Sequence, residues 1–236
     1  MGIDTDTDIE TGAVLVIGTD RGIGRSIARR LEERGDPVIG IDGETLDLTD
    51  AAAVRSAIDR SAAGRTIGRV VLAWLDPSSF RAVPIVQLDE SEWDSAAERS
   101  MRAAFVVLQQ VHATIPDGAR VMVVLPTVAA TGVSELVPLC SAVEAIRVMA
   151  KAVARRWGAR SITLNTIEVE LAAFMLGDDP ADGVEVPAVP VLGVAALPEG
   201  SAVADVVGLI DLLSSAPAAA ITGGLLVADR GTVMQP

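Results

Sequence analysis

An apolar run (residues 13–17), a glycine-rich turn and an amphipathic run (residues 22–34) follow one another without a break. The two runs predict a buried strand and a helix. Gly18, Gly22 and Gly24 in the turn let the backbone take unusual dihedral angles and lie close to a ligand. The start of the helix would aim free N–H groups and the positive end of its dipole at a diphosphate. The stretch therefore predicts the first strand, turn and helix of a dinucleotide-binding α/β fold.

Composition limits the other fold and partner classes. The chain has 236 residues, half of them apolar, which suits one domain with a substantial core. We expect this domain to cover residues 12–236 and the polar, acidic residues 1–11 to form a flexible tail. No apolar run approaches the roughly 18 residues of a membrane span, and none resembles a signal peptide.

Charge and the scarce residue types exclude further kinds of site. The net charge of −13 argues against nucleic-acid binding, which depends on Lys and Arg. His112 and Cys140 are the only residues of their types, so little material exists for a soft metal site. We expect His112 to be structural. A single cysteine also rules out an internal disulfide and favours a cytoplasmic location.

The rest of the chain alternates strands with helices. Strands are expected at 38–41, 45–50, 67–75, 120–125, 161–167 and 225–228, and helices at 51–62, 91–114, 139–157 and 200–214. Thr49 or Asp50 would cap the first of these helices and Ser91 the second. Residues 177–200, rich in Pro, Gly and Ala, predict a mobile flap beside a site. The alternation predicts a parallel sheet covered by helices on both faces, with ligands beyond the carboxyl ends of its strands.

Asp42 follows the second predicted strand, close to the spacing of about 20 residues at which an acid meets the adenosine ribose. A carboxylate there would accept hydrogen bonds from the ribose hydroxyls of NAD and repel the extra phosphate of NADP. The alternative is a solvated aspartate at a strand end.

From about Ala13 to Gly231 the chain resembles the short-chain dehydrogenase/reductase family. The resemblance is carried by Gly18-x-x-x-Gly22-Ile-Gly24, Asp42, Asp47-Leu48, Trp93-Asp94, Ile162-Thr-Leu-Asn165 and Thr222-Gly223 with Asp229 and Gly231. Ile17 departs from the family, which usually has a threonine there. The resemblance implies a single-domain, Rossmann-like, doubly wound sheet of seven parallel strands. It also implies a homo- or hetero-oligomer built on the long helices 91–114 and 139–157.

The resemblance further implies a site for NAD, best supported in its adenosine half. The residues implied to bind the cofactor are Gly18, Arg21, Gly22, Ile23, Gly24, Asp42, Asp47 and Leu48.

The family's catalytic positions are all substituted. Its reaction uses a tyrosine as proton donor or acceptor, a lysine four residues later, a serine and an asparagine. Counted along this chain, these positions fall on Leu139, Val143, Pro126 and Ser100. The chain contains no tyrosine, so no shift of the alignment restores one.

Other side chains do not replace the missing groups. Lys151 lies roughly 12 Å along the helix axis from Val143. Arg147 is closer, but its guanidinium stays protonated and cannot act as an acid or base. Cys140 as a nucleophile would need a base nearby.

The family's motifs beside the nicotinamide are also changed. Leu72-Ala-Trp-Leu75 replaces an asparagine-alanine-glycine turn, and Val169-Glu170 replaces proline-glycine. The role of Glu170 stays open, because a solvated loop residue is the simpler interpretation.

The sequence therefore predicts a catalytically inactive, structural or regulatory subunit paired with an active homologue. Two alternatives stay open. One is an NAD-dependent oxidoreductase with an unconventional active site. The other is a ligand-sensing or structural module with an empty cofactor cleft.

Overall fold

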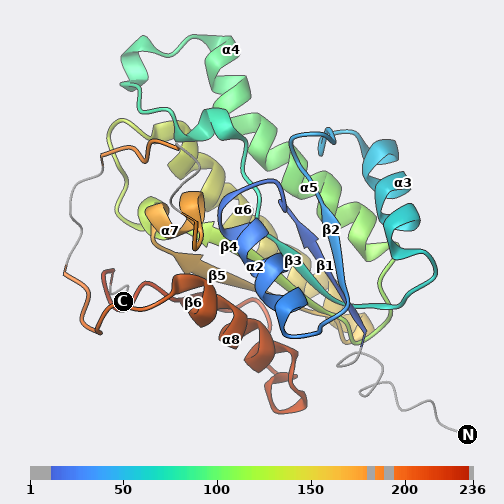
Figure 1. Ribbon diagram of the computed structural model, residues 1–236. Helices are drawn as coiled ribbons and strands as arrows, with labels where there is room; N and C mark the ends of the chain where they lie inside the picture. Colours follow the sequence, from blue (N-terminus) through green and yellow to red (C-terminus); the bar gives the residue numbers. More distant parts are fainter. Residues whose placement is uncertain (1–11, 180–183, 189–193, 234–236) are drawn as a thin grey trace, which may run out of the picture.

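The computed structural model describes residues 12–179, 184–188 and 194–233 (Figure 1). The predicted tail 1–11 lies outside these residues, and the predicted flap 177–200 lies only partly within them. The single domain over 12–236 stays a prediction.

One parallel sheet forms the centre of the described chain, with strand order β2-β1-β3-β4-β5-β6. Its strands are β1 (Ala13–Ile17), β2 (Val38–Ile41), β3 (Ile67–Leu72), β4 (Arg120–Pro126), β5 (Thr163–Val169) and β6 (Leu225–Val227). The chain builds outward from β1 first on one side and then on the other, so strand order reverses between β1 and β3. In open α/β sheets this reversal marks the place where ligands bind.

The structure confirms the predicted Rossmann-like sheet, but the described residues form six strands where seven were expected. The predicted strand at 45–50 is a pair of turns instead. The Asp42 carboxylate accepts hydrogen bonds from the backbone N–H groups of Glu44 and Thr45, and Asp47 accepts one from that of Thr49. Aspartate side chains that bond to the backbone two or three residues ahead favour turns over extended chain.

Helices cover both faces of the sheet. They are α2 (Gly22–Glu33), α3 (Ala51–Ala62), α4 (Glu90–Trp93), α5 (Arg99–His112), α6 (Val137–Trp157), α7 (Leu171–Leu176) and α8 (Ala202–Ser214). Short helical turns are η1 (Pro77–Phe80), η2 (Ile85–Gln87), η3 (Asp94–Glu98), η4 (Thr127–Ala130), η5 (Gly158–Arg160) and η7 (Ala216–Ala218). In Figure 1, α2 and α8 lie in front of the sheet and α3, α5 and α6 behind it. No helix among the described residues is both long and apolar enough to span a membrane.

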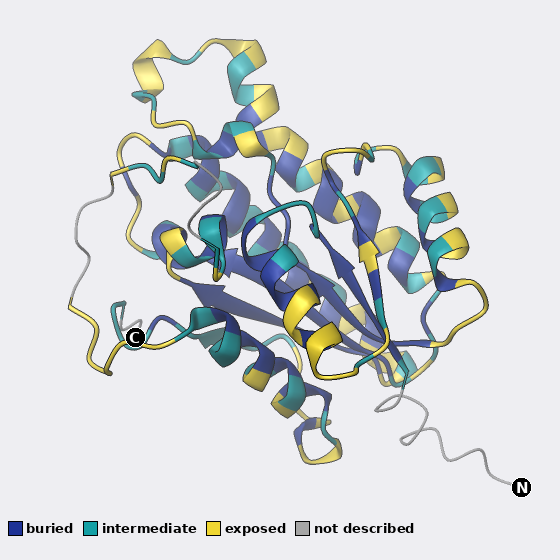
Figure 2. Cartoon of the chain, viewed as in Figure 1, coloured by how far each residue is buried: buried dark blue, intermediate teal, exposed yellow. Residues whose placement is uncertain are grey.

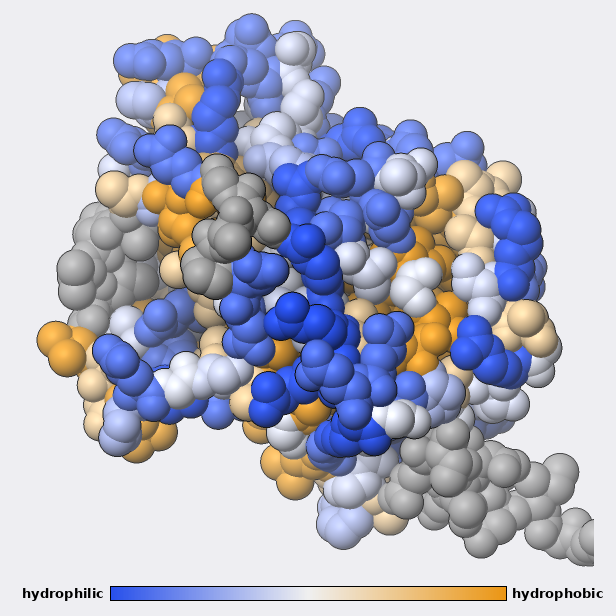
Figure 3. All heavy atoms as spheres, viewed as in Figure 1, coloured by the Kyte–Doolittle hydropathy of each residue, from blue (hydrophilic) through white to orange (hydrophobic). Residues whose placement is uncertain are grey.

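Burial follows from this layering. Strands β1, β3, β4 and β5 are buried along their whole length, as Figure 2 shows, because helices cover both of their faces. The helices keep a polar outer side, and Figure 3 shows hydrophilic side chains over α2.

The helix caps correct one prediction and confirm another. Asp50 caps α3 by accepting hydrogen bonds from the N–H groups of Ala52 and Ala53. Ser91 was expected to cap the next helix, which is wrong. Asp89 is the cap, because its side chain accepts from the N–H of Glu92 while the Glu92 side chain accepts from the Asp89 N–H.

The sheet edge at β6 depends on one buried amide side chain. Asn165 on β5 is 1% exposed. Its side chain donates to the carbonyl oxygen of Ile221 at 2.8 Å and accepts from the N–H of Gly224 at 3.0 Å. These two bonds fix the segment that leads into β6.

Replacing Asn165 with leucine should lower the free energy of unfolding by about 2 kcal/mol, because both backbone groups lose their partner. Urea unfolding followed by circular dichroism measures this change. Gln109→Leu, at an exposed position on α5, is the control and should change stability little. Equal stability of the two variants would contradict the assigned role of Asn165.

Candidate functional site

The glycine turn between β1 and α2 is closed by the protein's own backbone. Gly18 and Gly22 have positive φ angles of +99° and +52°. A Cβ on Gly18 would lie 2.5 Å from the carbonyl oxygen of Ala73, and one on Gly24 would collide with the carbonyl oxygen of Gly18. Glycine is therefore required here by the contact between β1, α2 and the end of β3, before any ligand is considered.

Trp74 crosses the mouth of this turn. Its Cβ lies 3.0 Å from the position of a Cβ on Gly18, and its indole edge, including Nε1, would overlap a Cβ on Gly43. The side chain thus extends from the glycine turn to the residue after Asp42. Trp74 is only 7% exposed, so its indole is packed in place.

Helix α7 covers the other side of the turn. A Cβ on Gly22 would lie 2.5 Å from the carbonyl oxygen of Phe174 and 2.7 Å from that of Met175. After the helix, the N–H of Asp178 donates to the Ser26 hydroxyl of α2 at 3.1 Å. The carbonyl end of α7 therefore meets the N-terminal turn of α2, and the two opposite dipole ends attract each other.

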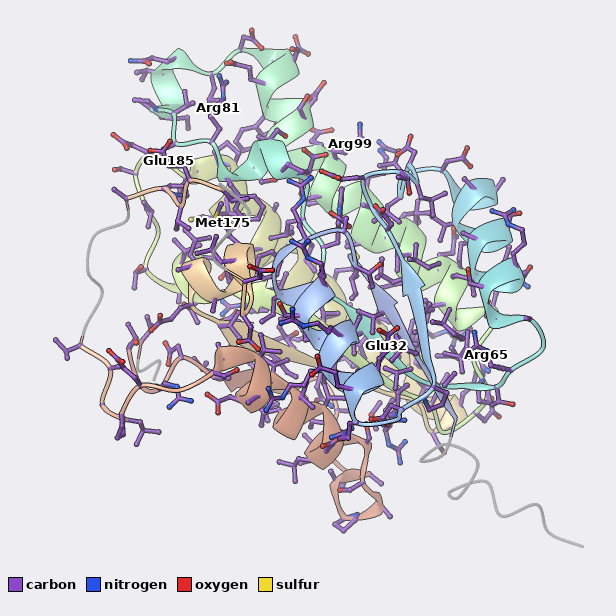
Figure 4. The ribbon with its side chains drawn as sticks, in the orientation of Figure 1. Glu32, Arg65, Arg81, Arg99, Met175 and Glu185 are labelled. Carbon is purple, nitrogen blue, oxygen red and sulfur yellow. The ribbon has the colours of Figure 1, made fainter. Side chains whose placement is uncertain are left out.

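A cavity of about 240 Å³ opens between these elements at the carboxyl ends of the strands. It is lined by Gly18 and Arg21 of the turn, Ala73, Trp74, Leu75, Pro77, Phe80 and Arg81 after β3, Phe174 and Met175 of α7, and Val184 and Glu185. Figure 4 labels Arg81, Met175 and Glu185, which come from three separate segments. The walls are mainly apolar and aromatic.

The charged groups at the cavity are already paired in part. Arg21 bonds to the Asp20 carboxylate at 3.1 Å and forms an ion pair with Glu44. Arg81 forms an ion pair with Glu92. Sequence reasoning singled out neither Arg81 nor Glu185, because both lie in irregular segments whose place relative to the turn depends on the fold.

Several of the predicted adenosine-binding residues have side chains that are engaged locally. One oxygen of Asp42 accepts from two backbone N–H groups. The hydroxyl and N–H of Thr49 both donate to Asp47, which lowers the pKa of this carboxyl group. Leu48 and Ile23 are each 1% exposed and belong to the core.

In the conformation observed, Trp74 and α7 occupy space next to the glycine turn that a bound dinucleotide would use. An adenosine ribose held by Asp42 would have to lie between that carboxylate and the glycine turn, where the Trp74 indole stands. The diphosphate would need the space beside Gly22 that α7 covers. Open space lies between the turn, the segment after β3 and α7.

The four positions that correspond to the family's catalytic residues do not line the cavity. Leu139 and Val143 are completely buried in the core, and Pro126 ends the buried strand β4. The Ser100 hydroxyl accepts a hydrogen bond from the N–H of Asp76 at 2.9 Å and lies 3.0 Å from the Ser79 hydroxyl. Ser100 therefore holds the segment after β3 in place.

The remaining candidates also have structural partners. Arg147 forms ion pairs with Glu144 at 2.5 Å and with the buried Glu168 at 3.7 Å. Glu170 precedes α7 and accepts from the Thr232 hydroxyl at 2.7 Å.

His112 lies at the far end of α5, against Trp157, with 5.0 Å between ring centroids. Burial and the nearby Arg160 lower its pKa. This placement agrees with a structural role.

Comparisons with known proteins extend over almost the whole chain. A family model described as enoyl-(acyl carrier protein) reductase matches residues 44–233. A D-threitol dehydrogenase from Mycolicibacterium smegmatis is 27% identical over 98% of this chain and 96% of its own length. The 3-oxoacyl-[acyl-carrier-protein] reductase FabG of Escherichia coli is 24% identical over 96% of this chain and 99% of its own.

A solved structure has the same fold. The short-chain dehydrogenase from Burkholderia cenocepacia, solved in complex with NADP, superposes with a TM-score of 0.74. It is 24% identical in sequence, over 95% of this chain and 99% of that protein.

These relatives overturn the expectation of a catalytically inactive subunit. The proteins that match over their full length are a dehydrogenase and reductases, and the solved neighbour carries NADP. The inactive subunit was predicted from substitutions at the family's four catalytic positions. Nothing in these comparisons points to a subunit without activity.

The environment of Cys140 predicts a poorly reactive thiol. Burial raises its pKa, and the Sγ–H donates to the carbonyl oxygen of Val128 at 3.8 Å. Since the thiolate is the reactive form, a disulfide reagent at pH 8 should label the native protein much more slowly than the same protein in urea. Absorbance of the released thiol measures both rates, and equal rates would contradict this burial.

Proposed function

The chain belongs to the short-chain dehydrogenase/reductase family, and we propose that it is an oxidoreductase dependent on a nicotinamide dinucleotide, with an active site that does not use the family's tyrosine and lysine. The cavity beside the glycine turn carries this proposal. It lies at the carboxyl ends of the strands, where strand order reverses, as ligand sites in such sheets do.

Binding of the dinucleotide requires the cleft to open. Rotation of the Trp74 indole away from Gly43 would free the space between the turn and Asp42. Movement of α7 would free the N–H groups at the start of α2 for the diphosphate. Arg21, at the mouth of the turn, would then face the diphosphate. When bound, the nicotinamide supplies or accepts the hydride.

Asp42 favours NAD over NADP in this proposal. Its carboxylate would repel a phosphate on the adenosine ribose, although the solved neighbour carries NADP. Arg21 does not offset this effect, because Asp20 and Glu44 already hold its guanidinium.

Glu185 is our candidate for proton transfer. Among the described residues that line the cavity, it is the one with a carboxyl group, which can serve as a general acid or base. The guanidinium groups of Arg21 and Arg81 do not serve in that role. Leu139 and Val143 are buried and carry no proton to exchange. The Glu185 carboxyl group would give a proton to the substrate oxygen on reduction and take it back on oxidation.

The cavity walls suit a carbonyl or alcohol substrate with an apolar body. Leu75, Pro77, Phe80 and Phe174 would contact that body.

Self-association and location stay predictions. Phe105 on α5 is 52% exposed and Val148 on α6 is 61% exposed, so the two long helices carry apolar side chains that a second subunit would cover. A cytoplasmic location rests on the single cysteine.

Replacing Trp74 with alanine should tighten NADH binding about tenfold, or by about 1.4 kcal/mol, because the indole no longer has to be displaced. Fluorescence of bound NADH measures the dissociation constant, below the unfolding temperature of the variant. Trp93→Ala, on α4 outside the cavity, is the matched control and should leave binding unchanged. If the parent protein and both variants bind neither NADH nor NADPH, the result would instead favour a module with an empty cofactor cleft.

Replacing Glu185 with glutamine should lower turnover about 100-fold and leave the dissociation constant of NADH unchanged, since the amide cannot transfer the proton. NADH consumption over a panel of carbonyl substrates measures turnover. Glu199→Gln removes the same charge from an exposed segment outside the cavity and should keep the parent rate. Equal turnover of both variants would exclude Glu185 as the proton donor.

A further inference from the structure

Two buried arginines lie side by side near the amino ends of the strands, at the opposite end of the sheet from the glycine turn. Arg69 of β3 and Arg120 of β4 are each 5% exposed, and they are register partners in the parallel sheet. Register partners on neighbouring strands point to the same face and are about 4.8 Å apart at their backbones. Arg65, labelled in Figure 4, precedes β3 and marks this end of the sheet.

The two guanidinium groups differ in their partners. Arg69 bonds to the carboxylate of Asp36 at 3.1 Å, so its charge is compensated. Arg120 donates through Nη1 to the carbonyl oxygens of Gly118 and Ser161, and among the described residues it has no carboxylate within ion-pair distance. Its Nε is buried without any hydrogen-bond partner. Arg120 thus carries a buried positive charge that the described chain does not neutralise.

Arg120 lines a cavity of about 600 Å³ between the loops that precede β4, β5 and β6. Its polar walls include Ser161, Thr163 and Thr222, and its apolar walls include Ile162, Ala219 and Ala220. The Thr222 Oγ1 accepts from the N–H of Leu164 at 3.2 Å, and its hydroxyl can in addition donate one hydrogen bond.

The acid on the cavity wall does not cancel this charge. Asp117 accepts from Nε of Arg160 at 2.6 Å and is mostly exposed, so its carboxylate is already paired. The wall of the cavity therefore includes an arginine without a carboxylate partner among the described residues, and the hydroxyl-bearing residues Ser161, Thr163 and Thr222. Burying a charge without a counter-charge is costly, and an anion in the cavity would remove that cost.

We propose that this cavity is a second ligand site. It binds a small hydroxylated metabolite through the metabolite's oxyanion group, which is a phosphate or a carboxylate. Arg120 pairs with the oxyanion, and the hydroxyl groups of Thr163 and Thr222 donate to its remaining oxygens or to the ligand's own hydroxyls. The volume lies within the range for small-molecule sites.

This site is separate from the cleft at the glycine turn. Strand β4 runs from Arg120 at one edge to Pro126 at the other, a length of about 20 Å. An anion in the cavity would therefore bind without displacing a ligand from the cleft, and it would tie together the loops that lead into β4, β5 and β6.

Calorimetric titration of the full-length protein with inorganic phosphate, and separately with acetate, tests the site at constant ionic strength maintained with sodium chloride. We expect at least one of the two anions to bind, and the anion that binds more tightly identifies the oxyanion group that the site prefers. Arg120→Gln should weaken the binding of that anion at least tenfold. Arg30→Gln removes the same charge from an exposed position on α2 and should bind like the parent protein.

Two further variants keep the test decisive if Arg120→Gln does not fold. Arg120→Lys retains the charge and should retain part of the affinity, whereas Thr222→Val, at the exposed rim, should weaken binding severalfold without loss of folding. Circular dichroism checks the fold of each variant. Failure of both anions to bind the parent protein, or equal affinities in all folded variants, would overturn the proposal. Neither result bears on NADH binding, because the proposed cofactor cleft lies at the carboxyl ends of the strands.

Discussion

The close approach of backbone segments at the glycine turn is the contact on which the rest of the structure depends. Each of three glycines faces a carbonyl oxygen that would clash with a Cβ: Gly18 faces that of Ala73, Gly22 that of Phe174, and Gly24 that of Gly18. This contact sets the distance of α2 from β1 and β3, and it lets α7 lie directly on the first turn of α2. The glycines thus have a structural reason to be present that is independent of any ligand.

The same contact decides where chemistry can take place. With α7 on one side and Trp74 on the other, the open volume is limited to a mainly apolar cavity beside the turn. Leu139 and Val143 fill core space behind it and add to stability through burial instead of supplying protons. In the proposed oxidoreductase, Glu185 in the wall of this cavity would transfer the proton.

The carboxyl ends and the amino ends of the strands differ in how their charged side chains are paired. At the carboxyl ends, Arg21 and Arg81 are matched with nearby acids. At the beginning of the strands, Arg69 is paired with Asp36, whereas the hydrogen-bond partners of Arg120 within the described ranges are carbonyl oxygens. In a chain with a net charge of −13, a buried guanidinium without a carboxylate is a local reversal of the overall charge, and such a group attracts anions.

The sequence by itself determined the fold class, most of the strands and helices, and the position of the glycine turn, because these depend on local apolar periodicity and on residues with special backbone freedom. It misplaced the strand at 45–50 because aspartate side chains there bond to nearby N–H groups. It could not find the cavity, since Arg21, Arg81 and Glu185, which line it, are far apart in the chain. Only the tertiary structure decided that Trp74 reaches Gly43 and that Arg120 has no carboxylate partner in the part of the chain that the structure describes. Both depend on which segments the sheet brings together, and contacts of that kind leave no periodic signal in the sequence.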